Sequence, residues 1–180
     1  AFTPTFGKTV LMMSDKQSFL VTLCIGLSNL FWLPLMGALS DRVGRRPLLI
    51  VFTCLMILTA WPVLHWLVGS PSFAHLLEAE LWLSFLYASY NGAMVVYLAE
   101  VMPAEVRACG FSLAYSLATA LFGGFTPAIS SYLIHATGDK AMPGVWLTIA
   151  AVCGLLGTLI IRRLLKQYQT RQNGIAVAAL

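Results

Sequence analysis

The sequence predicts an all-α, polytopic membrane helix bundle. Of the 180 residues, 59% are hydrophobic and only 10% are charged, with a mean hydropathy of +0.82. A water-soluble domain carries about 25% charged residues. Five long stretches contain no Lys, Arg, Asp or Glu: 19–39, 47–69, 81–99, 108–138 and 141–161. Each is close to or beyond the roughly 20 apolar residues that cross a bilayer as a helix.

The sequence predicts one partial and five complete membrane helices. We expect the partial helix over 1–13 and the complete ones over 19–39, 47–68, 77–99, 108–135 and 143–165. Pro47 and Pro143 suit the starts of two of these helices, because the first turn has no partner for the missing N–H. Residues 1–166 are therefore expected to form one transmembrane bundle, with 167–180 as a loose cytoplasmic tail. Because the first apolar stretch is short, we expect the chain to be a piece of a longer protein.

The helix over 108–135 has an irregular centre. Gly123 and Gly124 are followed by Pro127, which cannot donate a backbone hydrogen bond. This composition predicts a bent or broken helix with a mobile or cavity-lining role. Small residues are also typical of a helix that packs closely against a neighbour, so both interpretations stay open.

Lys and Arg are unevenly divided between the two ends of the predicted bundle. Segments on the cytoplasmic side of a membrane carry an excess of these residues. One end has only Lys8, Lys16 and Lys140. The other end, which we therefore expect to be cytoplasmic together with the C-terminus, has Arg42, Arg45, Arg46, Arg107, Arg162, Arg163, Lys166 and Arg171.

The turn at residues 37–46, GALSDRVGRR, concentrates charge between two predicted helices. Gly37 permits close approach of helices, and Gly44 permits a tight reversal of the chain. Asp41 ends one helix and Arg107 begins another. If these helices are neighbours, Asp41 is expected to bind Arg107 and the free N–H groups of that helix start. Such a latch holds the cytoplasmic side closed and must break when that side opens.

A second charged group follows the helix over 77–99. Its first member, Glu100, is expected to meet Arg42 or Arg45 of the earlier turn. Acidic and basic residues alternate at matched ends of three helices, which favours pairing between them. Charged residues at helix ends can also serve only as anchors at the membrane surface, and that alternative stays open.

Polar residues at helical spacing indicate faces turned away from lipid. In the helix over 77–99, Ser84, Tyr87, Asn91 and Met94 share one face, and Tyr90 borders it. Elsewhere the polar or small residues that suggest such a face are Ser112, Tyr115, Thr119, Gly123 and Thr126 over 108–135, and Asn29 over 19–39.

Seven residues are candidates to line a path for a solute. Lys8 is expected either to meet a carboxylate or to extend to the outer interface. For the others, the alternative is hydrogen bonding between packed helices. The candidates are Lys8, Asn29, Tyr87, Tyr90, Asn91, Tyr115 and Thr119.

Three segments resemble one family of membrane carriers. GALSDRVGRR at 37–46, YLAEVMPAEVRACGFSLAYSLATALFGGFTP at 97–127 and TPTFGK at 3–8 are similar to the metabolite–proton symporter family of the major facilitator superfamily. The resemblance covers the whole chain and implies the C-terminal six-helix half of a twelve-helix fold, with the first helix truncated. It implies a solute site between two halves and proton-driven import by alternating access. The implied solute is a small carboxylate, with citrate first, tricarballylate next and other metabolites of the family after them.

The resemblance also sets the expected partners. These are the carboxylate, protons, the lipid of a bacterial inner membrane and an N-terminal six-helix half, with no nucleic acid. No charged side chain lies at mid-membrane depth, so the groups that bind a carboxylate and carry a proton are expected mainly in that other half. Of the residues present, only Glu80 and His65 are plausible proton carriers.

Other function classes find less support in the sequence. There is no Gly-x-Ser-x-Gly or His-Glu-x-x-His motif, and the four cysteines lack ligand spacing. We therefore expect no enzyme, no cofactor and no metal. A channel or a structural membrane subunit remains the alternative to a carrier.

Overall fold

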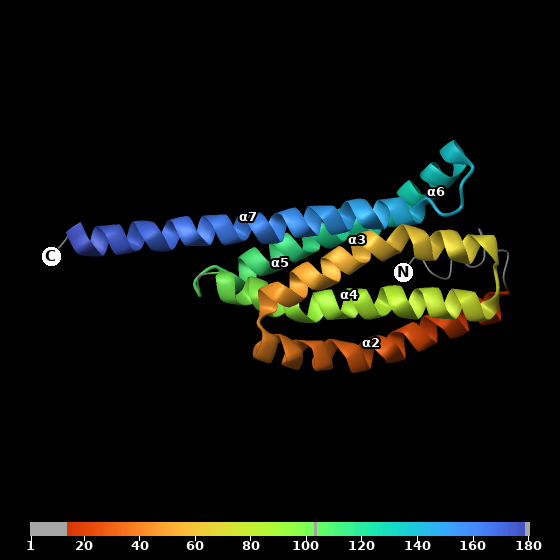
Figure 1. Ribbon diagram of the computed structural model, residues 1–180, viewed down its shortest axis with the longest axis horizontal. Helices are drawn as coiled ribbons and strands as arrows, with labels where there is room; N and C mark the ends of the chain where they lie inside the picture. The colour runs from red at the N-terminus through yellow and green to blue at the C-terminus, as the bar shows by residue number, and fades with distance from the viewer. Residues whose placement is uncertain (1–13, 103, 179–180) are drawn as a thin grey trace.

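The computed structural model describes residues 14–102 and 104–178, and within them every regular element is helical, as predicted. Five segments are long and apolar enough to cross a membrane. In chain order (Figure 1) the helices are α2 (Asp15–Val43), α3 (Arg45–Gly69), α4 (Phe73–Val101), α5 (Arg107–Ala118), the π-helix η1 (Thr119–Gly124), α6 (Thr126–Thr137) and α7 (Pro143–Ala178).

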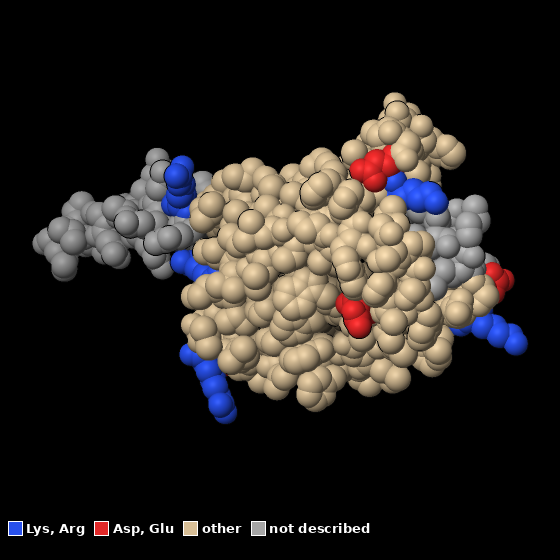
Figure 2. Space-filling model, turned by 45° about the vertical axis from the view of Figure 1, so that its right-hand side comes forward, with Lys and Arg blue, Asp and Glu red and all other residues tan. Residues whose placement is uncertain are grey.

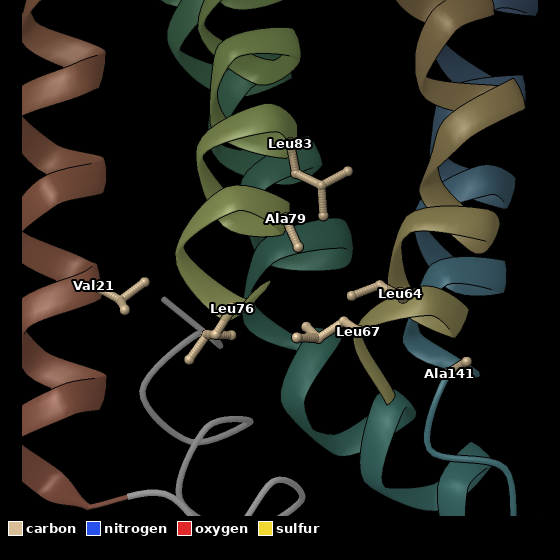
Figure 3. Packing of buried hydrophobic residues seen from close by; sticks show 7 residues of the cluster. All are labelled: Val21, Leu64, Leu67, Leu76, Ala79, Leu83 and Ala141. Atoms are coloured by element: carbon tan, nitrogen blue, oxygen red, sulfur yellow. The ribbon is translucent and has the colours of Figure 1, made fainter. Parts of the chain in front are cut away.

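Four of the helices form a row in the order α2, α4, α3 and α7. The extensive helix contacts are α2 with α4, α4 with α3, and α3 with α7. A core cluster joins them at one end of the bundle (Figure 3), where leucines of α3 and α4 meet Val21 of α2 and Ala141 in the turn before α7. Leu67, Leu76 and Val21 are fully buried there. These contacts fix the helices that carry the charged turn.

Two glycines allow helix backbones to touch in this row. A Cβ atom at Gly92 of α4 would lie 2.9 Å from the Leu33 carbonyl oxygen of α2. A Cβ atom at Gly144 of α7 would lie 2.9 Å from the Ala60 carbonyl oxygen of α3. Each crossing lies beside a proline inside the neighbouring helix, Pro34 in α2 and Pro62 in α3. Any side chain in place of these glycines would push the helices apart.

The fourth span, from Arg107 to Thr137, is interrupted. The α-helical hydrogen bonding of α5 changes to π-helical over Thr119–Gly124, and α6 begins at Thr126 with Pro127 in its first turn. The predicted break in this helix is therefore present. From Arg107 to Thr137 only Ser130 is buried, so this span packs on the rest of the described chain far less than α4 does.

The predicted tail is wrong at one point, and the predicted partial helix cannot be compared. The sequence predicts a helix ending at 165 and a loose tail from 167, but α7 continues to Ala178. Gln, Lys and Arg are good helix formers, so loss of apolarity ends the membrane span without ending the helix. The partial helix over 1–13 lies outside the described residues.

Figure 2 shows a surface whose middle is largely uncharged, with charged side chains gathered towards its two ends.

Candidate functional site

A single residue connects the two long helices that carry the charged turn. Gly44 separates α2 from α3 and has φ of +98°, a conformation that side chains with a Cβ atom rarely adopt. Its N–H donates to the Ser40 carbonyl at 3.1 Å, which ends α2. Gly44 therefore permits the tight reversal that the sequence predicts.

Arg45 is the centre of a charged network at this turn. Its Nε and Nη2 donate to the two carboxylate oxygens of Glu100 on α4, each at 2.6 Å. Its Nη1 donates to Asp41 Oδ1 at 2.6 Å and to Ser40 Oγ at 3.1 Å. The planar guanidinium suits this paired geometry, in which every bond is charge-assisted or held by a buried hydroxyl. Of the two partners predicted for Glu100, the structure selects Arg45.

The predicted pair of Asp41 with Arg107 is absent from the part of the chain that the structure describes. Asp41 binds Arg45, while Arg107 donates from Nε and Nη2 to the Met102 carbonyl at 3.3 Å. The physical reason is the helix order: α2 packs mainly on α4, and α5 is not its packing partner. The prediction was conditional on α2 and α5 being neighbours. Arg42 is exposed at the end of α2.

Three residues at this end of the bundle were missed or misassigned by sequence reasoning. Gly37 was expected to permit close helix approach, but a Cβ atom there would meet nothing within 4 Å; the glycine that matters is Gly92 opposite it. Ser40 is buried and shared between Arg45 and the Gly37 carbonyl. The signal available for Gly92 was its place as a single glycine inside an apolar helix. Glycine there costs about 1 kcal/mol relative to alanine, so its presence suggests that packing requires it.

Arg46, the next residue along the turn, packs instead of pairing. Its guanidinium carbon lies 5.5 Å from the centre of the Tyr97 ring on α4. Tyr97 is itself buried with Leu48 and Leu49 of α3. The turn is thus attached to α4 by two arginines, one through Glu100 and one through an aromatic face.

The predicted polar face is largely assembled. Ser84 Oγ on α4 donates to Asn29 Oδ1 on α2 at 2.8 Å, which links the two helices. One turn further, Asn91 Nδ2 donates to the Tyr87 hydroxyl at 3.4 Å. The Tyr115 side chain of α5 also lies near Tyr87. Polar groups of three spans therefore meet at one place, and Tyr87 is still 53% exposed there.

The remaining path candidates lie elsewhere. The Tyr90 hydroxyl faces α7, where it would be 3.3 Å from a Cβ atom at Gly154. The Tyr90 side chain packs inside the bundle, against the buried cluster that contains Tyr97, and away from the face of Tyr87. Thr119 is exposed at the first position of η1. Lys8 lies outside the described residues.

The stripe predicted along 108–135 does not continue past the break. A π-helical turn adds a residue to each turn, so side chains after it are rotated relative to those before it. Tyr115 stays with Tyr87, whereas Thr126 accepts a hydrogen bond from Trp146 Nε1 of α7 at 3.0 Å. Spacing at 3.6 residues per turn could not anticipate this change of face.

The chemistry of this face is neutral. It offers hydroxyls and side-chain amides, which bind a polar solute by hydrogen bonds without performing a reaction. Within residues 14–102 and 104–178, no group of three His, Cys, Asp or Glu side chains could hold a metal ion. The charged network and the polar face together suit a protein that binds a solute and changes shape.

Comparison with known proteins decides the family. The family model described as "Major Facilitator Superfamily" matches residues 1–178. The chain belongs to the major facilitator superfamily. It is accordingly a multi-pass membrane protein of a transporter family, and the all-helical bundle is the partial helix bundle that this family implies.

Curated relatives of this superfamily member include two citrate–proton symporters. The one from Klebsiella pneumoniae is 61% identical over 162 residues, or 90% of this chain and 36% of its own length. The one from Salmonella typhi is 52% identical over 173 residues, or 96% of this chain and 40% of its own length. The chain thus spans well under half the length of these two relatives.

A more distant relative carries another name. The alpha-ketoglutarate permease of Escherichia coli (strain K12) is 37% identical over 134 residues, which cover 72% of this chain and 30% of that protein. The comparison with solved structures found no match.

Proposed function

We propose that this chain is the C-terminal half of a proton-coupled symporter that imports citrate by alternating access. The observation that carries the proposal is the 61% identity to a citrate–proton symporter over 90% of the chain. The second relative of that name, at 52% identity, supports the same solute. The N-terminal half, the proton and the carboxylate are the partners that this function requires.

The polar face is the proposed C-terminal wall of the solute path. Asn29, Tyr87, Asn91 and Tyr115 come from three spans and supply neutral donors and acceptors. Neutral groups can orient a carboxylate, but they do not neutralise its charge. In this proposal the cationic partners and the proton carrier lie mainly outside the described residues, with Lys8 as one candidate.

The charged network at the α2–α3 turn is the proposed closing contact of the cytoplasmic side. Arg45 ties Asp41 of α2 to Glu100 of α4, so the two helices end together. The excess of Lys and Arg at this end supports a cytoplasmic location for the turn and the C-terminus, in a bacterial inner membrane.

One uptake experiment tests the function. The full-length parent protein is expressed in a bacterium that cannot take up citrate, and uptake of labelled citrate, tricarballylate and proline is compared, with and without a protonophore. We expect saturable citrate accumulation that the protonophore abolishes. A preference for tricarballylate would correct the solute within the same family. Rapid, non-saturable flux that never exceeds equilibrium would indicate a channel and sink the proposal.

A further inference from the structure

Trp146 of α7 contacts both sides of the break in the fourth span, Arg107–Thr137. Its ring stacks on Phe122 inside η1, with ring centres 5.8 Å apart and planes inclined by 29°. Its Nε1 donates to Thr126 Oγ1, on the first residue of α6, at 3.0 Å. One side chain from a supporting helix thus fixes the last turn of η1 and the first turn of α6.

Thr126 satisfies a carbonyl that the break would leave free. In a π-helix the carbonyl of Phe122 would accept from the N–H of residue 127, but that residue is Pro127 and has no N–H. The Thr126 hydroxyl donates to the Phe122 carbonyl instead. Its oxygen accepts from Trp146, so the two bonds form a chain from α7 into η1.

The same chain of bonds occurs once more, in a helix without a break. Trp82 Nε1 of α4 donates to Thr59 Oγ1 of α3 at 3.1 Å, and Thr59 donates to the Leu55 carbonyl at 2.7 Å. There the acceptor carbonyl lies in the continuous helix α3. The pair Trp82–Thr59 therefore has the same hydrogen-bond chemistry as Trp146–Thr126. It differs because its acceptor carbonyl lies in a continuous helix, so there is no break for it to hold in place.

We propose that Trp146 is a positioning residue for the transport reaction, acting through Thr126 on the η1–α6 junction. The proposal rests on the proposed function for its transport readout. By fixing the junction, Trp146 sets the orientation of the preceding turns, which carry Tyr115 near Tyr87. α7 then has a role in solute binding although it contributes no group to the polar face.

The test uses the full-length transporter with Trp146→Phe, which keeps ring stacking and removes the N–H donor, and Thr126→Val, which removes the hydroxyl. Thr126→Ser retains the hydroxyl and is the rescue variant. Trp82→Phe and Thr59→Val are the matched controls in the unbroken helix. Amide hydrogen exchange over 115–130 measures the junction, and initial rates of labelled citrate uptake separate KM from maximal rate.

For Trp146→Phe and Thr126→Val we expect exchange over 119–126 to rise about threefold, the factor that an average interhelical hydrogen bond in a membrane gives. The KM for citrate should rise by a similar factor at unchanged abundance. The double variant should be no worse than either single one, because both remove the same chain of bonds. Thr126→Ser and both controls should leave exchange over 119–126 and the KM at wild-type values.

Exchange and transport separate this proposal from the proposed function. Unchanged exchange in both variants overturns the role of Trp146, whatever the protein transports. Faster exchange with an unchanged citrate KM also overturns it, because the residue would then be structural only. If the parent moves another solute, the exchange result stands and the KM for that solute decides.

Discussion

Helix α4 and the segment α5–η1–α6 are both long enough to cross a membrane, yet they differ in packing. α4 lies between α2 and α3 and has buried residues along most of its length, from Leu76 to Tyr97. The other span buries only Ser130 and changes its helix type halfway. A regular, buried helix holds its shape through its neighbours. A broken one needs specific contacts, and those of Trp146 serve this purpose.

The difference separates a closely packed scaffold from a span with few packing contacts. The row of α2, α4, α3 and α7 contains the close backbone crossings and the charged network. The span from Arg107 to Thr137 contributes Tyr115 and Thr119 but few packing contacts. Because polar side chains are costly in lipid, this span is expected to meet water or further protein. The following predictions test this division, from the largest effect to the smallest.

Replacement of Gly92 by Ala should damage the scaffold most. The new Cβ atom would lie 2.9 Å from the Leu33 carbonyl oxygen and 3.2 Å from the Gly37 nitrogen, so α4 must move away from α2. Overpacking of this kind costs about 1–3 kcal/mol. The measurement is thermal unfolding of the purified full-length protein, together with its membrane abundance.

The control for Gly92→Ala is Gly26→Ala, inside α2, where a Cβ atom would meet nothing within 4 Å. It should be neutral or slightly stabilising, because Ala favours a helix over Gly. Equal loss of stability in the two variants would contradict the close α2–α4 crossing.

Loss of the Glu100 carboxylate should reduce transport next most strongly. Glu100→Gln weakens one bond to Arg45 and replaces the acceptor of the other with an N–H donor, whereas Asp41→Asn weakens a single bond. We expect uptake to fall several-fold in Glu100→Gln and less in Asp41→Asn, with insertion largely intact in both. Initial uptake rates, normalised to membrane abundance, measure this order.

Two further variants make the network test specific. Glu105→Gln alters an exposed carboxylate in the connection between α4 and α5 and should have no effect. The exchange of charges in Arg45→Glu with Glu100→Arg should recover part of the lost activity. If Asp41→Asn is the more damaging change, the Asp41–Arg107 contact of the sequence prediction regains support.

The two tyrosines of α4 should differ in their effect on solute binding. Tyr87→Phe removes a hydroxyl from the polar face, while Tyr90→Phe removes one that faces Gly154 of α7. We expect the citrate KM to rise about three- to tenfold in the first, as for loss of one hydrogen bond, and to stay unchanged in the second. Equal shifts would place the solute path on another face of α4.

The two candidate proton carriers on the scaffold helices should have no effect on proton coupling. Glu80 of α4 and His65 of α3 are the only plausible carriers that the sequence offers, and His65 stacks on Trp61 at 5.1 Å. Glu80→Gln and His65→Ala should leave the ratio of protons to citrate unchanged. Simultaneous recordings of medium pH and labelled uptake measure that ratio. A loss of coupling in either variant would assign the proton carrier to this half.

The sequence predicts the local features of this fold well. Composition and charge-free length define the spans, and the run Gly123–Gly124 before Pro127 marks the break, because these residues act on their own backbone. Pairing of Glu100 with Arg45 was predicted as one of two choices. Local signals of this kind need no knowledge of which helices are neighbours.

Features that depend on helix order were not predictable in the same way. The Asp41–Arg107 latch assumed that α2 and α5 pack together, and the roles of Gly92 and Tyr90 depend on α2 and α7 lying on opposite sides of α4. Hydropathy identifies a span but does not rank its possible partners. The π-helical turn adds a second source of error, because it changes the register on which every stripe beyond it was drawn.

The length of α7 has a practical consequence for biophysical work. At 1.5 Å per residue, the 36 residues of Pro143–Ala178 extend about 54 Å, well beyond a hydrocarbon layer of about 30 Å. The final turns of α7 project from the end of the bundle at which α2 turns into α3 (Figure 1). A fluorophore or affinity tag attached at Ala178 would therefore be held at the end of a continuous helix, outside the bilayer. It would report rigid-body tilting of this bundle.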